Sequence, residues 1–305
     1  MKAVITGATG AVGMALLAEL EAQEVEILVL CRKGSRRNDR IKESRYIKKV
    51  ECSLDELGSF TLGTEEKYDV FYHFAWEGTT GSSRNDMPLQ NRNVKYALDA
   101  LELASRLGCK TFVGAGSQAE YGRVEGKLTP ETPAFPENGY GIAKLCAGSM
   151  CRVAAESLGI RFVWARILSV YGPFDTENSM VMSTLIKIMN GERPIFTAGE
   201  QIWDYLYSAD AARALYLLGA TENAKGIYCL GSGNPQPLKE YICAIKDAVD
   251  ADAEIGLGEV PYAKNQVMYL CADISKLTTD TGFVPKTDFV DGIKKTAEWY
   301  KTEKN

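Results

Sequence analysis

The feature that most constrains the fold is a glycine-rich turn that begins at residue 7. Residues 1–6 (MKAVIT) form an apolar run typical of a buried strand, and residues 14–20 (MALLAEL) have strong helix propensity with an apolar face. The turn between them reads GATGAVG, which places glycines at positions 7, 10 and 13. A strand, a glycine turn and a helix in this order can hold a dinucleotide diphosphate at the helix N-terminus. The chain therefore predicts a dinucleotide-binding unit at its start.

The three glycines of this turn are expected to have separate roles. Gly7 would allow the tight turn, Gly10 would let the backbone approach the phosphates, and Gly13 would allow close packing of helix on strand. The expected cofactor contacts of the loop are Gly7, Thr9, Gly10, Ala11, Val12 and Gly13.

Short β-branched runs alternate with helical runs as far as about residue 170. Strands are expected over 25–31, 47–52, 69–75, 110–114 and 161–167, and helices over 11–21, 89–107 and 138–158. This alternation predicts an α/β fold, a Rossmann-type doubly wound parallel sheet that binds ligands at the carboxyl ends of its strands. The later, irregular part predicts a smaller C-terminal substrate-binding lobe. We expect a dinucleotide-binding domain over 1–169, completed by about 208–231, and the lobe over 170–207 and 232–305.

Composition narrows the range of partners. A chain of 305 residues is long enough for about two domains. Its net charge of −5 gives no basic footprint, so neither nucleic acid nor an anionic membrane is an expected partner. Eight cysteines without a C-x-x-C pair and a single histidine predict reduced thiols and no metal site. No signal peptide or membrane span is apparent, and we expect a cytoplasmic protein.

A tyrosine and a lysine stand four residues apart in the segment YGIAK, residues 140–144, and so lie one turn apart on a helix face. Alone, this spacing is more typical of a surface contact. An ammonium at roughly 4 Å, in a cleft of effective dielectric about 20, would favour the phenolate by roughly 4 kcal/mol, or about three pKa units. Together with the glycine turn, the pair predicts that Tyr140 has a pKa near neutrality and acts as a general acid or base.

Further motifs occur in a recognisable order along the chain. They read GSQAEYG over 116–122, TPETP over 129–133, RILSVYGP over 166–173 and DYLYSAD over 204–210. With GATGAVG and YGIAK, they make the chain resemble, nearly end to end, the extended short-chain dehydrogenases/reductases of the NAD-dependent epimerase/dehydratase family, which modify nucleotide-linked sugars. The resemblance implies three catalytic residues. Ser117 would hold the substrate oxygen, Tyr140 would exchange a proton with it, and Lys144 would also contact the nicotinamide ribose.

Cofactor choice depends on the loop after the second strand. An acidic residue there holds the ribose of NAD, whereas an arginine accommodates the extra phosphate of NADP. Here the position of the acid is Cys31, and Arg32 follows it in a basic run that continues to Arg37. We expect NADP as cofactor with a contact from Arg32, with NAD as the alternative. The same residues could also form a solvated basic loop that binds no ligand, which is the simpler interpretation.

Other cofactor contacts are expected at the ends of the third and fourth strands. Residues 73–76 read HFAW where the family often has HLAA beside the cofactor, and His73 itself is expected to be structural. Asn93 matches an asparagine that the family carries near the active site, although a polar residue on an amphipathic helix is an equal alternative. The candidate contacts in this part of the chain are Cys52, Ser53, Phe74, Ala75, Trp76 and Asn93.

Departures from the family motifs bear on the substrate. Dehydratases of the family carry an Asp-Glu pair directly after the catalytic threonine, where this chain has Gln118 and Ala119, and Glu120 comes one position too late. A 4,6-dehydratase is therefore disfavoured. Trp203 stands where the family commonly has an arginine that holds the phosphate of the sugar nucleotide. Another cation, Lys187 or Arg193, would have to bind that phosphate here. The candidate substrate contacts are Trp76, Glu77, Gln118, Ser169 and Trp203.

Three functions are consistent with these residues. The first is an NADPH-dependent reductase of a nucleotide-linked 4-keto-6-deoxyhexose, and the second is a nucleotide-sugar 4-epimerase that retains NAD. The third is a non-catalytic dinucleotide sensor, which would not need all three catalytic residues. The basic loop favours the reductase, because a reductase must exchange its spent cofactor. From the resemblance we also expect a homodimer formed through the helices over 89–107 and 138–158.

Overall fold

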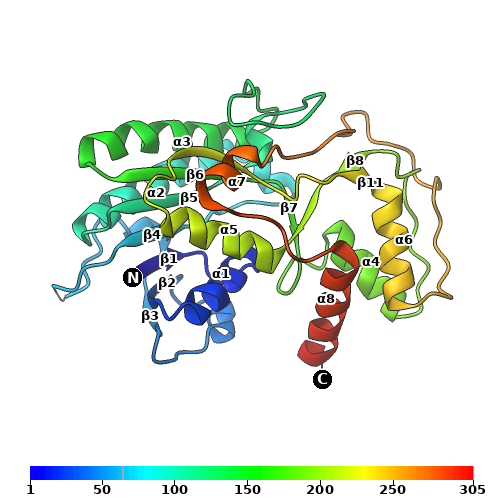
Figure 1. Cartoon of the computed structure of the whole chain (residues 1–305), viewed down its shortest axis with the longest axis horizontal. Coiled ribbons are helices and arrows are strands. Elements are labelled where there is room, and N and C mark those ends of the chain that lie inside the picture. The colour runs from blue at the N-terminus through cyan, green and yellow to red at the C-terminus, as the bar shows by residue number, and fades with distance from the viewer. Residues whose placement is uncertain (64, 305) are drawn as a thin grey trace.

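Among the residues that the structure describes, seven parallel strands form the central sheet, in the order β10-β6-β5-β4-β1-β2-β3 (Figure 1). The computed structural model describes residues 1–63 and 65–304. The strands are β1 (Lys2–Thr6), β2 (Glu26–Cys31), β3 (Ile47–Glu51), β4 (Val70–His73), β5 (Thr111–Ser117), β6 (Arg161–Ile167) and β10 (Gly226–Leu230). The chain runs outward from β1 to β3 and then returns to the other side of β1 with β4, so the sheet is doubly wound as predicted.

Helices cover both faces of the sheet. On one face α1 (Ala11–Ala22) packs against α5 (Ser208–Ala220), and on the other α2 (Met87–Arg106) packs against α3 (Gly139–Leu158) (Figure 1). Each face has its own apolar core, with Leu16 and Leu215 buried in the first and Leu101 and Cys151 in the second. Burying a side chain of this size contributes about 1.5–3 kcal/mol. The predicted strands and helices agree with these elements to within three residues at their ends.

The glycine turn has the geometry that its sequence requires. Gly7 has a φ of 76°, and a Cβ on it would lie 2.4 Å from the backbone nitrogen of Ala75. A Cβ on Gly13 would lie 2.3 Å from the carbonyl oxygen of Gly7, so α1 packs too closely on the turn for any side chain there. Gly10 differs, because a Cβ at this position would meet nothing within 4 Å. The turn is therefore closed at Gly7 and Gly13 and open at Gly10.

Two helices that border the site have side-chain caps, whereas α1 has none. Asp86 accepts a hydrogen bond from the Leu89 nitrogen at 3.0 Å at the start of α2, and Asn138 accepts one from the Gly141 nitrogen at 2.8 Å at the start of α3. At the start of α1 the capping position is Gly10, which has no side chain to accept from the first turn. The first backbone N–H groups of α1 are thus available to an anion.

The remainder of the chain builds a smaller lobe at one end of the molecule (Figure 1). It contains the parallel pair β7 (Ser169–Tyr171) and β9 (Tyr205–Tyr207), and the antiparallel pair β8 (Ile202–Trp203) and β11 (Gln236–Pro237). The helices α4 (Met180–Met189), α6 (Leu238–Val249) and α8 (Phe289–Lys304) pack together beside them, while α7 (Ser275–Thr281) contacts α5 and β10. Residues 208–230 return to the sheet, since α5 covers α1 and β10 pairs with β6.

In the described part of the chain, four short 3-10 helices follow the carboxyl ends of sheet strands. They are η1 (Arg36–Arg40) after β2, η2 (Leu54–Glu56) after β3, η3 (Gly81–Asn85) after β4 and η4 (Gln118–Glu120) after β5. All eight cysteines are free thiols, and six of them are buried. Within residues 1–63 and 65–304, no helix is long and apolar enough to cross a membrane, and no group of three metal-ligating side chains occurs.

Candidate active site

Two adjoining cavities lie at the carboxyl ends of the sheet strands, around the glycine turn. The first, of about 450 Å³, is bordered by the loops that follow β2 and β3. The second, of about 400 Å³, is bordered by the end of β5, the start of α3 and the segment that joins β6 to β7. Both are lined by Gly7, Gly10, Phe74 and Trp76, so they meet at the open part of the turn. Two cavities joined at a helix N-terminus fit the two halves of a dinucleotide.

The structure brings most of the expected site residues together around these cavities. The first cavity is lined by the expected residues Gly7, Thr9, Gly10, Arg32, Cys52, Ser53, Phe74, Ala75, Trp76 and Glu77. The second is lined by the expected residues Gly7, Gly10, Ala11, Val12, Gly13, Phe74, Trp76, Ser117, Tyr140 and Lys144. Among the described residues, Asn93, Gln118, Ser169 and Trp203 line neither cavity.

Ser117 and Tyr140 meet where the end of β5 faces the first turn of α3. Ser117 is the last residue of β5, and its hydroxyl is close enough to Tyr140 to act on the pKa of that phenol. Two further contacts hold Ser117, since its backbone nitrogen donates to Glu120 Oε1 at 2.8 Å and its Oγ accepts from the Ala119 nitrogen at 3.2 Å. Ser117 is therefore held in a defined position, and it lines the second cavity together with Tyr140, so that both could contact one substrate oxygen.

Lys144 is buried and holds its ammonium against a carbonyl and an indole. Its Nζ donates to the Ala115 carbonyl oxygen at 2.6 Å and lies 3.7 Å from the ring centroid of Trp76. The indole nitrogen of Trp76 in turn donates to Gln90 Oε1 at 2.9 Å. Burial lowers the pKa of Lys144 to about 7, although the charge of Glu120 acts in the opposite direction.

The electrostatics of Tyr140 differ from the sequence-based expectation. Burial raises the pKa of Tyr140 above its usual value, while the hydrogen bond from Ser117 and the charge of Arg84 lower it. The guanidinium carbon of Arg84 lies 4.3 Å from the centroid of the Tyr140 ring, whereas the Lys144 ammonium lies 5.9 Å away. The prediction that Lys144 brings the pKa of Tyr140 near neutrality is therefore wrong, because the ammonium is drawn to Ala115 and Trp76 instead.

Glu120 is a buried carboxylate with three hydrogen-bond donors. Besides the Ser117 nitrogen, it accepts from Arg166 Nε at 2.7 Å and from Trp164 Nε1 at 3.0 Å. Arg166 is itself buried, so the two charges form an ion pair inside the protein. These contacts give Glu120 a structural role at the end of β5 and leave it unsuited to proton transfer with a substrate.

Asn93 acts on the site through the backbone of a loop. Its Oδ1 accepts from the Glu77 nitrogen at 2.9 Å and its Nδ2 donates to the Glu77 oxygen at 3.0 Å. In place of the expected direct cofactor contact, the buried amide of Asn93 thus holds the segment that follows β4. His73 is structural as expected, because its Nδ1 shares a hydrogen bond of 2.9 Å with Thr6 Oγ1 and burial lowers its pKa to about 3.

The two substrate candidates in the lobe contact each other. Trp203 Nε1 donates to Ser169 Oγ at 2.8 Å, which joins β8 to β7 outside the two cavities. Arg193, one of the two cations considered for the phosphate, donates instead to Glu259 Oε2 at 3.0 Å. An arginine paired with a carboxylate in this way is poorly placed to bind a phosphate.

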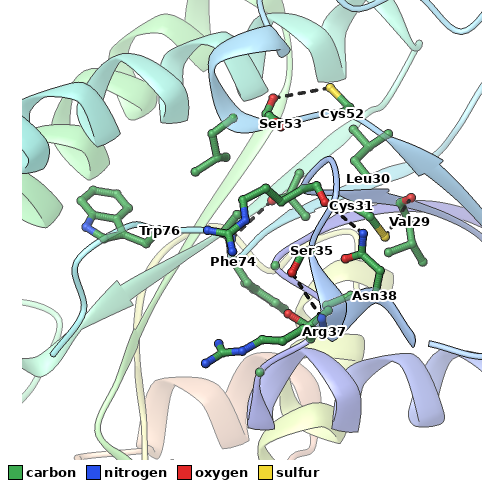
Figure 2. A pocket seen from close by; sticks show the side chains of 18 of the residues that line it. Val29, Leu30, Cys31, Ser35, Arg37, Asn38, Cys52, Ser53, Phe74 and Trp76 are labelled. Carbon is green, nitrogen blue, oxygen red and sulfur yellow. Dashed lines mark hydrogen bonds between the residues drawn. The ribbon is translucent and has the colours of Figure 1, made fainter. Parts of the chain in front are cut away.

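The ribose edge of the first cavity contains residues that the motif analysis missed. Ser35 and Asn38 line it next to Arg32 and Arg37 of the predicted basic run, and Asn38 Nδ2 donates to the Arg32 carbonyl oxygen at 2.9 Å. Figure 2 shows Ser35 and Asn38 near Cys31, at the end of the cavity away from Trp76. The only available signal for them was their place in the basic loop.

Two carboxylates also line the cavities without having been predicted. Asp55, in η2 three residues after Cys52, lines the first cavity. Asp175 lines the second cavity, and burial raises the pKa of its carboxyl. No motif marked Asp175, because it lies in an irregular segment between β7 and α4.

Comparisons with known proteins agree with this geometry. The model of the NAD dependent epimerase/dehydratase family matches residues 3–231. The chain is 25% identical to a dTDP-glucose 4,6-dehydratase of Streptomyces niveus, over 86% of this chain and 77% of that protein. It is 27% identical to an uncharacterized UDP-glucose epimerase of Bacillus subtilis, over 96% of each protein. The solved structure of DesIV, a dTDP-glucose 4,6-dehydratase of Streptomyces venezuelae with NAD bound, superposes with a TM-score of 0.86 at 22% identity and covers 100% of this chain and 98% of that one.

We predict that Glu120→Ala lowers the free energy of unfolding by about 3–5 kcal/mol, because Arg166 would stay buried without a partner. Glu120→Gln should cost less, since the amide oxygen can still accept hydrogen bonds. Urea denaturation followed by fluorescence measures both. Glu137→Ala is the control, because its ion pair with Arg123 is exposed and should contribute less than about 1 kcal/mol. Wild-type stability of Glu120→Ala would contradict the structural role of this carboxylate.

Proposed function

Because the chain belongs to the NAD dependent epimerase/dehydratase family, we propose that it is an NAD(P)-dependent oxidoreductase of nucleotide-linked sugars. The proposed reaction is the reduction of a nucleotide-linked 4-keto-6-deoxyhexose. The observation that carries the proposal is the second cavity, where Ser117, Tyr140 and Lys144 line one space that adjoins the glycine turn. A non-catalytic sensor would need the turn but would have no use for this triad of side chains.

The glycine turn fits the diphosphate of a nicotinamide dinucleotide. Gly10 leaves open space where a side chain would otherwise stand, and the uncapped N-terminus of α1 directs N–H groups toward it. The first cavity would hold the adenosine half and the second the nicotinamide half, with Lys144 contacting the ribose there. When bound, the cofactor supplies the hydride that reduces the sugar carbonyl.

The protein residues would handle the proton and the substrate oxygen. Ser117 Oγ would hydrogen-bond the carbonyl oxygen and align it beside Tyr140. As the carbon is reduced, the O–H bond of Tyr140 breaks and its proton moves to that oxygen, which becomes the new hydroxyl. The phenolate that remains would recover its proton from solvent. Asp175, at the border of the same cavity, is placed to accept a hydrogen bond from a sugar hydroxyl.

Cofactor preference is proposed to be NADP, with NAD as the alternative. Arg32 and Arg37 both line the first cavity where Cys31 takes the place of the acid that NAD-binding folds use for the ribose. Two guanidinium groups beside hydrogen-bonding Ser35 and Asn38 suit a phosphate on the ribose. The bound NAD named in the DesIV structure supports the alternative.

A 4-epimerase is the second candidate function. It is supported by the name of the Bacillus subtilis relative, and it would use Ser117, Tyr140 and Lys144 in the same roles while retaining NAD through both half-reactions. A dehydratase is less well supported, although relatives carry that name. The acid that elimination needs is missing from positions 118 and 119, and Glu120 is engaged by Arg166.

We further propose that the protein is a homodimer formed through α3 and its neighbour α2. Four side chains on α3, Ile142, Cys146, Met150 and Val153, are exposed and recur every three or four residues, so they form one apolar stripe along the helix. An apolar stripe of this kind on a surface helix is typical of a helix that packs against a partner. The stripe lies on the far side of α3 from the sheet core, in which Ala147 and Cys151 are buried.

The first test of the proposed function is a turnover assay. With nucleotide-linked 4-keto-6-deoxyglucose and excess NADPH, we expect multiple-turnover loss of NADPH absorbance and a 6-deoxy sugar product. Tyr140→Phe should lower turnover at least about a hundredfold while dinucleotide affinity changes little, because only the proton donor is removed. Lys144→Met should weaken both turnover and dinucleotide binding.

Two outcomes would contradict the reductase. Protein that purifies with NAD, consumes no NADPH with any keto-sugar and interconverts a nucleotide sugar with its 4-epimer would be an epimerase. Near-normal activity of Tyr140→Phe on the true substrate would show that another group transfers the proton.

The cofactor proposal predicts a change in affinity at one arginine. Arg32→Asp should weaken NADPH binding by about ten- to hundredfold, because it removes a charge-assisted contact and adds a repulsive charge. Its affinity for NADH should change much less in calorimetric titration. The matched control is Arg36→Asp, which changes the same charge in the same loop at a position that does not line the cavity. If the two substitutions changed NADPH affinity equally, or if the wild type bound NADH more tightly, the basic loop would be solvated surface without a role in cofactor choice.

The dimer proposal predicts that Met150→Lys dissociates the protein, because it places a charge in the middle of the apolar stripe. Light scattering coupled to size-exclusion chromatography should give twice the chain mass for the wild type and the single-chain mass for the variant. Val284→Lys, at an equally exposed apolar residue away from α3, should remain dimeric. A monomeric wild type would refute this part of the proposal.

A further inference from the structure

The loop between β4 and α2, residues 74–86, carries an arginine to the face of the catalytic tyrosine. Arg84 lies in η3 with its guanidinium carbon 4.3 Å from the Tyr140 ring centroid. Its Nη1 donates to the Thr79 carbonyl oxygen at 3.0 Å, which fixes the side chain to its own loop. The next residue, Asn85, accepts from the Gly139 nitrogen at 3.0 Å and joins the loop to the start of α3. Arg84 is therefore held over Tyr140 from two sides.

We propose that Arg84 is a positioning residue for the chemistry of Tyr140: its guanidinium stabilises the phenolate that Tyr140 becomes when it gives its proton to the substrate oxygen. The inference rests on the proposed function of Tyr140 and adds the group on which that function depends. It assigns to Arg84 the charge effect that the sequence pattern assigns to Lys144. No other bond changes in this step, and the phenolate regains its proton from water.

The other groups around Tyr140 do not provide this charge. The Lys144 ammonium on α3 lies 5.9 Å from the ring and is bound to the Ala115 oxygen and the Trp76 face. Ser117, at the end of β5, is neutral. Glu120, in η4, acts against the phenolate, and its own charge is paired with Arg166.

Two further contributions act on Tyr140 without depending on Arg84. The carboxyl of Asp175 lines the same cavity from the segment between β7 and α4, and a negative charge there would also oppose the phenolate. Tyr140 lies in the first turn of α3, at the positive end of the helix dipole, which favours a negatively charged phenolate. Since burial raises the pKa of Tyr140, Arg84 provides the nearest positive charge that opposes this effect within the described part of the chain.

The expected size of the effect follows from the distance and the exposure of Arg84. A charge of opposite sign within about 4–6 Å commonly shifts a pKa by about 1–3 units. Arg84 is only half-buried, and solvent screens part of its field, so we expect a shift near the lower end of that range. Without Arg84 the pKa of Tyr140 should rise, and the limb of the pH profile that reports Tyr140 should move to higher pH.

The test is a direct titration of Tyr140 in protein labelled at the tyrosine ζ-carbon, by ¹³C NMR. The Tyr140 resonance is assigned by its absence in Tyr140→Phe. We expect Arg84→Met to raise the pKa of Tyr140 by about one unit. Arg84→Lys should restore most of the wild-type value, because an ammonium can also lie over the ring. Arg92→Met is the matched control, since it removes the same charge from an exposed position on α2.

Kinetic profiles then separate the roles of Arg84. If it acts through Tyr140, Arg84→Met should shift the pH profile of kcat and leave the KM for the sugar nearly unchanged. An unchanged Tyr140 titration in Arg84→Met would overturn the inference. So would a raised KM without a shift, because Arg84 would then be a binding site for the substrate phosphate.

The titration also keeps this inference separable from the proposed function, because it needs neither substrate nor turnover. If Arg84→Met leaves the titration unchanged while Tyr140→Phe is inactive, the inference fails and the proposed function stands. If Tyr140→Phe is fully active, the proposed function fails whatever the titration gives.

Discussion

The close backbone contact between the glycine turn and the end of β4 is the constraint on which the site depends. Gly7 lies so near Ala75 that a side chain cannot fit between them. This contact places the carboxyl end of β1 against the segment that begins at Phe74, at the point where the strand order reverses. Both cavities open from that point, and α1 begins there with an uncapped N-terminus. A doubly wound sheet binds its ligand at such a reversal because two loops leave in opposite directions and a crevice remains between them.

Three buried charged side chains, Glu120, Arg166 and Lys144, lie at or near the second cavity. Glu120 pairs with the buried Arg166 and accepts a hydrogen bond from the backbone nitrogen of Ser117. The ion pair therefore fixes the end of β5. Above it, Lys144 is stabilised by a carbonyl and an indole face, which satisfy an ammonium less completely than a carboxylate would. The proposed proton donor, Tyr140, has the guanidinium of Arg84 at 4.3 Å from the centroid of its ring. Glu120 is held in this ion pair, whereas the carboxyl of Asp175 lines the same cavity as Ser117.

The fold could be predicted from local sequence, whereas the electrostatics of the site could not. Strands and helices follow from periodicity and from the glycine turn, and both are properties of neighbouring residues. The tyrosine–lysine spacing correctly put both side chains in one cavity, but the partner of Lys144 is set by Trp76, which is distant in sequence. Arg84 was missed for the same reason, because no spacing relates a residue of the β4–α2 loop to the start of α3. Asn93 was expected to contact the cofactor, but its amide is engaged by the backbone of Glu77 in the loop that precedes its helix.

In the proposed reaction, hydride passes between a nicotinamide cofactor and the sugar, and Tyr140 provides the proton. The most direct measurement uses NADPH deuterated at the transferable position, with the nucleotide-linked keto-sugar as substrate and mass spectrometry of the product. We expect one deuterium per product molecule, located on the carbon that carried the carbonyl. Product that contains no deuterium would mean that the hydrogen comes from a retained cofactor or from water, which would contradict the reductase. The absence of any product with every keto-sugar tried would contradict catalysis of this reaction.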